Sequence, residues 1–549
     1  MKIFQPKLFL TLKNYSAKKL VSDLVAGIIV AIIALPLSIA LAIASGVSPE
    51  KGLYTAIVAG FVISFLGGSS VNISGPTAAF ATIVAGIVAV HGTSGLVIAT
   101  IMAGLLLILM GVFRFGALIK YIPFTITTGF TSGIALTIVI GQIKDFLGLT
   151  YPEGTHAIET VEKLEAVFHS IGTVNLQALI VGGVALAILI VWPKISKKIP
   201  GSLIAVIVGV LMVKLFDMEV NTIGDLYSIS RDLPAFALPK FDFATVRQLI
   251  PSAFTIAILA GIESLLSCVV SDGMVGDKHN SNTELIAQGV GNIASGLFGG
   301  IPATGAIART AANVKNGGRT PVAGMVHAAV LLLVLVLLMP YAAWIPMPVI
   351  AAILFMVAYN MCEWRQFVRI CKTAPASDIL VLVLTFVLTV VFDLVVAIEV
   401  GMVLSAILFM KRMTDVTNLR TWKDADKNDP ARLKPIPKNV AVVELDGPMF
   451  FATSDKFAAI EIGSDVNTLI LRMRTVPSLD ISAFRSLETI YKLCNEKGIR
   501  LILSHVNEQP MKVMVKAHFI EKIGEENLAP NIDAALELAE KLSKVEANS

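Results

Sequence analysis

Long apolar segments, many of about 17 to 25 residues, recur through the first three-quarters of the chain. That length suits an α-helix that crosses a bilayer, and the shorter segments are expected to be half-helices. The pattern predicts fourteen segments, seven in each half of a transmembrane domain over residues 1–413. They lie near residues 24–44, 53–66, 76–90, 96–113, 119–140, 178–192 and 203–215, then near 250–270, 285–298, 306–314, 322–338, 349–358, 379–391 and 396–410.

Two of these stretches are interrupted in the same way. Gly67-Gly68 and Gly299-Gly300 each end an apolar segment, and Ser74-Gly75-Pro76-Thr77-Ala78 and Thr304-Gly305-Ala306 then open short helices. Irregular backbone at membrane depth is tolerated where it lines a cavity, and a helix start there presents free N–H groups and a positive dipole end. Paired broken helices predict a transporter site at the interface of two repeats. The alternative is that each is a loop between two spans.

The composition changes after Met413. Residues 414–438 are polar and rich in Asp and Pro, so we expect a linker. Residues 439–549 alternate strand and helix patterns and predict a small α/β domain. The expected strands cover 441–445, 468–473 and 499–504, and the expected helices cover 481–496, 512–517 and 532–542.

The bulk composition excludes several classes of protein. Of 549 residues, 55% are hydrophobic and 15% are charged, and the mean hydropathy of +0.78 indicates a polytopic membrane protein. A formal net charge of +4 is too small to indicate nucleic acid as a partner. The four cysteines and seven histidines show no metal-binding spacing, so we expect no metal and no cofactor. The absence of a P-loop or nucleophile elbow argues against an enzyme.

Basic residues predict the orientation. If the N-terminus is cytoplasmic, the inward loops hold Arg114, Lys120, Lys194, Lys197, Lys198, Lys278, Lys315, Arg319, Arg365, Arg369, Lys372, Lys411 and Arg412. The outward loops are acidic or mixed, with Asp145, Glu153, Glu159, Glu162, Asp217, Glu219 and Asp225. This bias places both termini in the cytoplasm. Because seven is odd, the second half (about 248–412) is inverted relative to the first (about 20–216).

Two charged residues within apolar segments are candidates for chemistry. Glu263 lies in the middle of the segment that begins the second half, and a carboxylate at that depth is costly unless it is paired, hydrated or protonated. Its expected role is proton carrier, cation ligand or partner of Arg309. Arg309 lies about one turn inside the second short helix and would attract an anion; the alternative is that it snorkels toward the cytoplasm.

In the C-terminal domain, Asp480 and Ser482 lie where a helix begins. Either side chain could cap that helix. The sharper alternative is a regulatory phosphorylation site at Ser482.

Several motifs together resemble the sulfate permease family of anion transporters. They are Ala34-Leu35-Pro36-Leu37-Ser38-Ile39-Ala40, Gly52-Leu53-Tyr54, Ser74-Gly75-Pro76-Thr77-Ala78-Ala79, Gly129-Phe130-Thr131-Ser132-Gly133, and Asn282-Thr283-Glu284-Leu285-Ile286-Ala287-Gln288-Gly289 through Asn292. The C-terminal domain resembles the STAS domain of this family. Within the family, Gln142-Ile143-Lys144-Asp145-Phe146-Leu147-Gly148 and Gly261-Ile262-Glu263-Ser264-Leu265-Leu266 are most similar to bacterial proton-coupled C4-dicarboxylate carriers.

The resemblance implies a core and a gate domain, with the anion between the two helix openings and the first span. The substrate-binding residues would be Leu37, Leu41, Gly75, Pro76, Thr77, Ala78, Thr304, Gly305, Ala306 and Arg309. Many relatives carry a glutamine and an aromatic residue where this chain has Leu37 and Leu41, so the contribution of that side stays open. Glu263 matches the position linked to cation coupling, and Ser482 matches the phosphorylated position of signalling relatives. STAS domains of the family often mediate dimer contacts.

We therefore expect a multi-pass cell-membrane transporter, acting as a homodimer, that takes up succinate or fumarate with protons; sodium is less favoured. The alternatives are a sulfate or bicarbonate transporter, an uncoupled exchanger or channel, a nucleobase permease of similar fold, and a sensor whose transport is vestigial.

Overall fold

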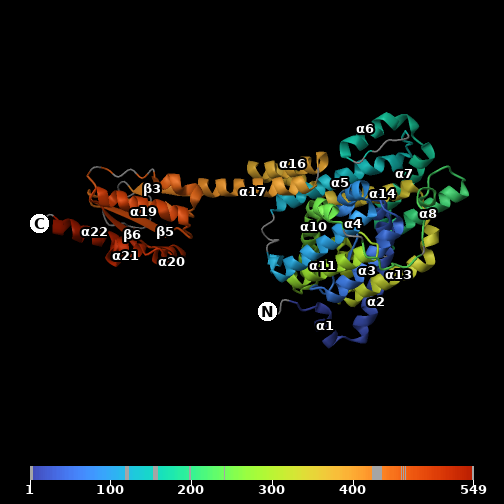
Figure 1. Cartoon of the computed structure of the whole chain (residues 1–549), viewed down its shortest axis with the longest axis horizontal. Helices are drawn as coiled ribbons and strands as arrows, with labels where there is room; N and C mark the ends of the chain where they lie inside the picture. The colour runs from blue at the N-terminus through green and yellow to red at the C-terminus, as the bar shows by residue number, and fades with distance from the viewer. Residues whose placement is uncertain are drawn as a thin grey trace. The chain divides into compact units, whose positions relative to one another are not determined.

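The computed structural model describes residues 4–117, 123–152, 157, 159–196, 199–230, 232–239, 242–392, 394–422, 436–458, 460, 463 and 465–546. Lys120, Lys197, Lys198, Glu153 and the middle of the expected linker (423–435) lie outside these residues. The chain forms two compact units, Met1–Val403 and Leu404–Ser549. Figure 1 draws the helical first unit in blue to yellow and the sheet of the second in orange to red.

Helices dominate the first half of the first unit. Its elements are α1 (Lys7–Thr11), η1 (Leu12–Asn14), α2 (Ala17–Ala44), α3 (Pro49–Leu66), β1 (Ser74–Gly75), η2 (Ala78–Phe80), α4 (Ala81–Val112), α5 (Phe124–Leu147), α6 (Thr160–Ser170), η4 (Ile171–Thr173), α7 (Leu176–Ile195), α8 (Gly201–Leu215) and α9 (Ile223–Leu226). Gly92, with φ +65°, breaks α4 into two helices. The break explains why the apolar pattern predicts two segments there.

The second half repeats this order. It contains α10 (Phe243–Val275), α11 (Ser281–Leu297), β2 (Thr304–Gly305), α12 (Ile307–Lys315), α13 (Val322–Ala342), α14 (Met347–Cys362), α15 (Trp364–Thr373), α16 (Ala376–Val391) and α17 (Leu394–Val416). In both halves, two helices lead into a two-residue strand and then a short helix. The predicted helical membrane fold, with its two broken segments, is confirmed.

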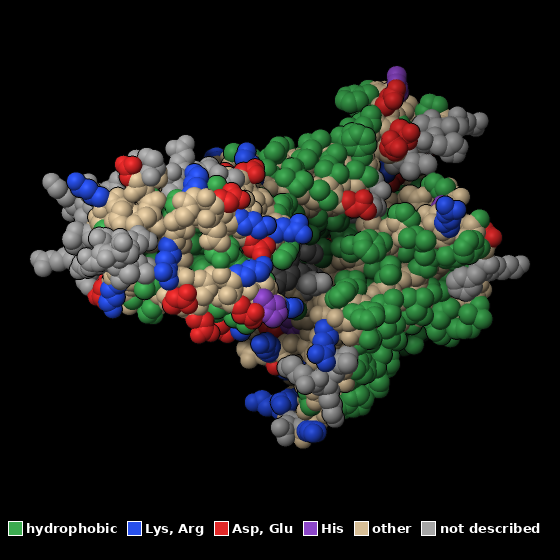
Figure 2. All heavy atoms as spheres, turned by 60° about the vertical axis from the view of Figure 1, so that its left-hand side comes forward, with side chains coloured by type: hydrophobic (Ala, Val, Ile, Leu, Met, Phe, Trp, Pro, Cys, Tyr) green, Lys and Arg blue, Asp and Glu red, His purple; other side chains and the backbone are tan. Residues whose placement is uncertain are grey.

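Length and hydropathy agree with a membrane location. Among the described residues, eight helices are long and apolar enough to cross a bilayer, and α8 and α16 are shorter apolar helices. Helix α12 has 9 residues. At about 1.5 Å per residue it spans roughly half of a ~30 Å hydrocarbon core, so it is a half-helix. Figure 2 shows hydrophobic side chains over much of the visible surface of this unit.

The second unit is built on a five-stranded sheet in the order β3-β4-β5-β6-β7. The strands are β3 (Asn418–Trp422), β4 (Val440–Asp446), β5 (Thr468–Thr475), β6 (Arg500–Ser504) and β7 (Leu528–Ala529). Among these described strands, β3 pairs with β4 in antiparallel fashion, and the other three pairings are parallel. Part of the expected linker is therefore an edge strand, because β3 pairs with β4 along its whole length.

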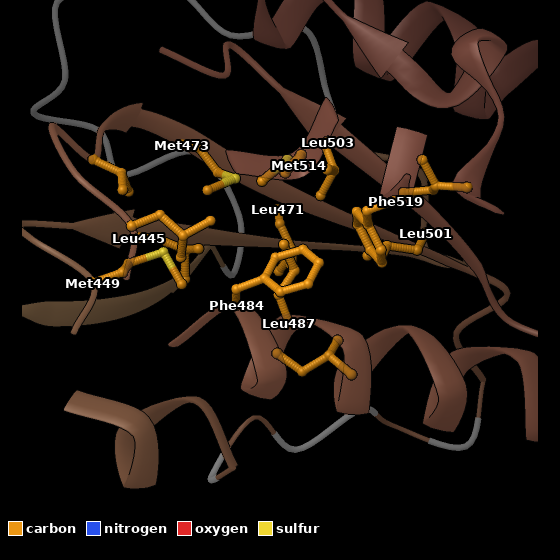
Figure 3. Close-up of a cluster of buried hydrophobic side chains, with 14 of the residues drawn as sticks. Leu445, Met449, Leu471, Met473, Phe484, Leu487, Leu501, Leu503, Met514 and Phe519 are labelled. Carbon is orange, nitrogen blue, oxygen red and sulfur yellow. The ribbon is translucent and has the colours of Figure 1, made fainter. Parts of the chain in front are cut away.

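Helices cover both faces of that sheet. They are η5 (Phe451–Thr453), α18 (Ser454–Ala458), α19 (Ile481–Glu496), α20 (Glu508–Lys516), α21 (Phe519–Ile523), η6 (Glu525–Asn527) and α22 (Ile532–Glu546). Figure 3 shows one core, in which Phe484 and Leu487 of α19 meet Leu471 of β5 and Phe519 of α21. The other face packs Ile470 and Ile502 against α22. The predicted small α/β domain is thus present, with two more strands than expected.

Candidate functional site

The two helix openings lie side by side. Strands β1 and β2 pair in antiparallel register, with Ser74 opposite Gly305 and Gly75 opposite Thr304. The amide of Ala306 extends the pairing by donating to the carbonyl of Ile73 at 2.8 Å. Residues more than two hundred positions apart therefore form one continuous stretch of irregular backbone, from which η2 and α12 begin.

Helix α11 holds the first opening in place. The buried carboxylate of Glu284 accepts hydrogen bonds from the amide of Gly68 at 2.9 Å and from the side chain of Asn72 at 2.8 Å. One turn later, the side-chain amide of Gln288 donates to the hydroxyl of Ser74 at 2.9 Å. The bond to Gly68 gives a backbone amide of the broken stretch the partner that it would otherwise lack, and the other two bonds position side chains of that stretch.

The second opening is supported by α10 and α11. Asn292 both accepts from the amide of Ala303 at 2.8 Å and donates to its carbonyl at 2.9 Å. The hydroxyl of Ser264 accepts from the amide of Gly305 at 3.0 Å. Because backbone at membrane depth has no water partners, these contacts fix where α12 starts.

Glu263 contacts the opposite half of the unit. Its carboxylate accepts a hydrogen bond from the hydroxyl of Thr77 at 3.0 Å, directly at the start of η2. Both side chains are partly exposed. Within the described residues, Glu263 and Arg309 form no ion pair. That pairing, one of three roles considered for Glu263, is therefore not what the structure contains.

Arg309 also reaches across to the first opening. Its side chain is 3% exposed, and its Nη2 donates to the carbonyl of Pro76 at 3.0 Å. Its Nη1 has no hydrogen-bond partner among the described residues. A Cβ at Gly75 would lie 2.6 Å from Nη1, so a larger residue here would require the guanidinium to shift from its present position. The side chain does not snorkel toward the cytoplasm, which excludes the alternative considered above.

The predicted residues not yet placed lie in η2, in α2 and just before α12. Ala78 is 5% exposed and lies in η2, and Ala306 precedes α12. Leu41 is buried, whereas Leu37 is partly exposed; both belong to α2, which packs against α12. The structure therefore brings together residues from both openings. It also places the first span, α2, beside α12, the helix that starts at the second opening.

His327 is a polar residue of this region that the sequence analysis missed. It lies in the apolar helix α13, is fully buried, and has no hydrogen-bond partner on either ring nitrogen within the described residues. A single histidine inside an otherwise apolar span was the available signal.

Ser482 lies in the second unit, in the first turn of α19. Asp480 caps this helix by accepting from the amide of Ala483 at 2.8 Å, and it also accepts from the amide of Phe451 at 2.9 Å. The capping interpretation of Asp480 agrees with this geometry. Ser482 is partly exposed one residue inside the helix.

Comparison with known proteins adds independent information. Residues 20–385 match the sulfate permease family, and residues 432–535 match the STAS domain. A putative sulfate transporter of Bacillus subtilis, YvdB, is 39% identical over 533 residues, which cover 95% of this chain and 98% of that protein. The bicarbonate transporter BicA of Picosynechococcus is 31% identical over 519 residues, 90% of each chain.

Solved structures agree on the fold. The murine solute carrier 26 family member A9 in its inward-facing state superposes with a TM-score of 0.88 at 20% identity, covering 98% of this chain and 94% of that one. The transmembrane domain of a cyanobacterial bicarbonate transporter BicA gives 0.63 at 30% identity, covering 71% and 98%. This chain therefore belongs to the sulfate permease family, and it is a multi-pass membrane transporter of small anions with a C-terminal STAS domain.

Proposed function

We propose that this protein is a secondary active symporter that carries an anion together with a proton, and that Glu263 carries the proton. The observation behind the proposal is the pair of contacts on adjacent residues: Thr77 donates to Glu263, and Pro76 accepts from Arg309. One dipeptide thus touches both the candidate proton site and the candidate anion site. A change of charge at Glu263 would therefore change the electrostatic potential at the proposed anion site.

The anion would lie at the joined openings. The proposed binding residues are Leu37, Leu41, Gly75, Pro76, Thr77, Ala78, Thr304, Gly305, Ala306 and Arg309. Helix starts supply N–H donors and partial positive charge, and Arg309 keeps an unpaired Nη1 beside Gly75. Leu37 and Leu41 add an apolar wall that can contact carbon but cannot hydrogen-bond.

The proposed substrate class is C4-dicarboxylates such as succinate and fumarate. Such an anion has carboxylates for the donors and a carbon chain for Leu37 and Leu41. The second candidate is an inorganic anion, because the similar proteins are named as sulfate and bicarbonate transporters. Sulfate has no apolar part to match the two leucines.

The remaining parts of the proposal concern the whole chain. The transport domain covers 1–413 and the STAS domain 439–549, both termini are cytoplasmic, and the protein works as a homodimer in the cell membrane. The basic residues of the expected inward loops support the orientation. Phosphorylation of Ser482 is proposed as a regulatory step.

Labelled succinate uptake into proteoliposomes with an inward proton gradient tests the function. We expect accumulation against the succinate gradient, blocked by unlabelled fumarate and not by sulfate or bicarbonate. Competition by sulfate or bicarbonate without succinate uptake would select the inorganic-anion candidate. Uptake that only equilibrates would indicate a channel or an uncoupled exchanger.

A further inference from the structure

A groove separate from the helix openings runs between α2, α8 and α13. Its volume is about 330 Å³, and every residue lining it is apolar or aromatic. The walls include Leu35 and Ile39 of α2, Val206 and Val210 of α8, and Val334 and Leu338 of α13. Its volume is at the lower end of the range for small-molecule sites.

The groove is open at the surface of the helices, where several of its wall residues are exposed. Leu211 and Leu338 of its walls are each 49% exposed, and Ile207 is 46% exposed. Apolar side chains with this exposure belong in contact with lipid tails when they lie on membrane-spanning helices. A hydrocarbon chain is the occupant that matches walls without charged groups.

One end of the groove has a different chemistry. Tyr341 and Trp344 line it there and contact each other edge to face, with ring centroids 5.2 Å apart. The ammonium of Lys214, at the end of α8, lies 3.3 Å from the centroid of the Trp344 ring. No acidic partner of Lys214 is found in the part of the chain that the structure describes. Aromatic rings and a lysine at a helix end are typical of the lipid headgroup level.

We propose that this groove binds an anionic phospholipid, with one acyl chain between α2, α8 and α13 and the headgroup phosphate paired with Lys214. The hydrocarbon part follows from the apolar walls, and the preference for negative charge follows from an exposed cation at the end of the groove. The inference is independent of which anion the protein transports.

Quenching of Trp344 by brominated lipids tests the proposal. The protein carries Trp192→Phe, Trp364→Phe and Trp422→Phe, so that Trp344 is the remaining reporter, and it is placed in vesicles of phosphatidylcholine with rising fractions of brominated phosphatidylglycerol or brominated phosphatidylcholine. We expect brominated phosphatidylglycerol to quench at a lower lipid fraction, by about fivefold, as one lysine near the surface would give. Equal quenching by both lipids would overturn the headgroup preference.

Three variants separate the groove from general lipid contact. Lys214→Gln should remove the preference for phosphatidylglycerol. Val334→Phe should fill the groove and weaken quenching by both lipids, whereas Val336→Phe, on the same helix but outside the groove, should leave quenching unchanged. If Val334→Phe and Val336→Phe behave alike, no acyl chain occupies the groove and the proposal fails.

Discussion

At the scale of single residues, the site depends on what lies on either side of Pro76 and Thr77. Arg309 contacts the carbonyl of Pro76, and Glu263 contacts the hydroxyl of Thr77, without an ion pair between them among the described residues. Because the two charged side chains do not bond each other, either one can be substituted without leaving the other without its partner. This arrangement allows their contributions to binding and coupling to be measured separately.

Glu263→Gln should abolish uptake driven by a proton gradient while leaving anion binding nearly unchanged. Glutamine can still accept from Thr77 but cannot take up and release a proton. Uptake with and without the gradient, together with calorimetric binding of succinate, checks this expectation. Glu399→Gln, at an exposed position of α17, is the matched control and should behave as the parent protein. Gradient-driven uptake by Glu263→Gln at the parent rate would reject the role of this carboxylate.

Gly75→Ala should weaken anion binding roughly 10- to 100-fold, as loss of one charge-assisted hydrogen bond would. The new Cβ would lie 2.6 Å from Nη1 of Arg309 and displace the guanidinium. Arg309→Ala should weaken binding to a similar extent. Gly86→Ala is the control, because a Cβ there meets nothing within 4 Å. Equal affinity for Gly75→Ala and Gly86→Ala would show that the space at Gly75 does not matter for binding, and parent affinity for Arg309→Ala would show that Arg309 does not bind the anion.

At the scale of elements, α11 carries a row of polar side chains along one side. Glu284, Gln288 and Asn292 follow each other at four-residue intervals and contact the loop before β1, the strand itself and the residue before β2. The spacing places all three on one face of the helix. One helix thereby contacts both interrupted segments, and Ser264 of α10 adds a further bond to the second.

Asn292→Leu should lower the melting temperature of the protein in detergent and reduce succinate binding. The substitution leaves the buried amide and carbonyl of Ala303 without their partners, at a cost of about 1–3 kcal/mol for each group. Asn316→Leu is the control, because Asn316 contacts only a carbonyl of its own helix, among the described residues. A melting temperature for Asn292→Leu equal to that of the control would contradict this account.

The sequence pattern predicted the helices well because the length of an apolar segment can be counted from neighbouring residues alone. All of the expected segments that the structure describes correspond to helices, and Gly92 explains the division of α4. The pairing of β1 with β2 could not be predicted in the same way, since it joins distant residues that share no periodicity. The direction of Arg309 and the burial of His327 also depend on tertiary packing. Strand β3 was missed because it is an exposed edge strand. Its polar residues Asn418, Arg420 and Thr421 gave it the composition of a linker.

At the scale of the whole molecule, the chain combines a membrane unit with an α/β unit that has its own core. The second unit buries Cys494 against Phe484, Leu487 and their neighbours. It also contains a single tryptophan, Trp422, in β3. The stability of this unit can therefore be followed within the full chain.

Burial raises the pKa of the Cys494 thiol to about 11. An unfolded thiol has a pKa of about 8.5, so between these values the unfolded chain loses a proton that the folded unit keeps. The free energy of unfolding should therefore be unaffected below about pH 8.5 and should fall as the pH rises toward 11. Urea unfolding is followed by Trp422 fluorescence after Trp192, Trp344 and Trp364 are replaced by Phe. Cys494→Ala should show a smaller fall between pH 8.5 and 10.5, and an identical fall would contradict the assignment.

The union of β1 and β2 has a consequence for how the protein can be blocked. The two openings cannot part without breaking the backbone bonds between them and the bonds from Gln288, Asn292 and Ser264 around them. A movement of one opening should therefore carry the other with it. A compound that binds across the paired strands would contact residues of both openings at once, so a substitution at either opening should lower its potency.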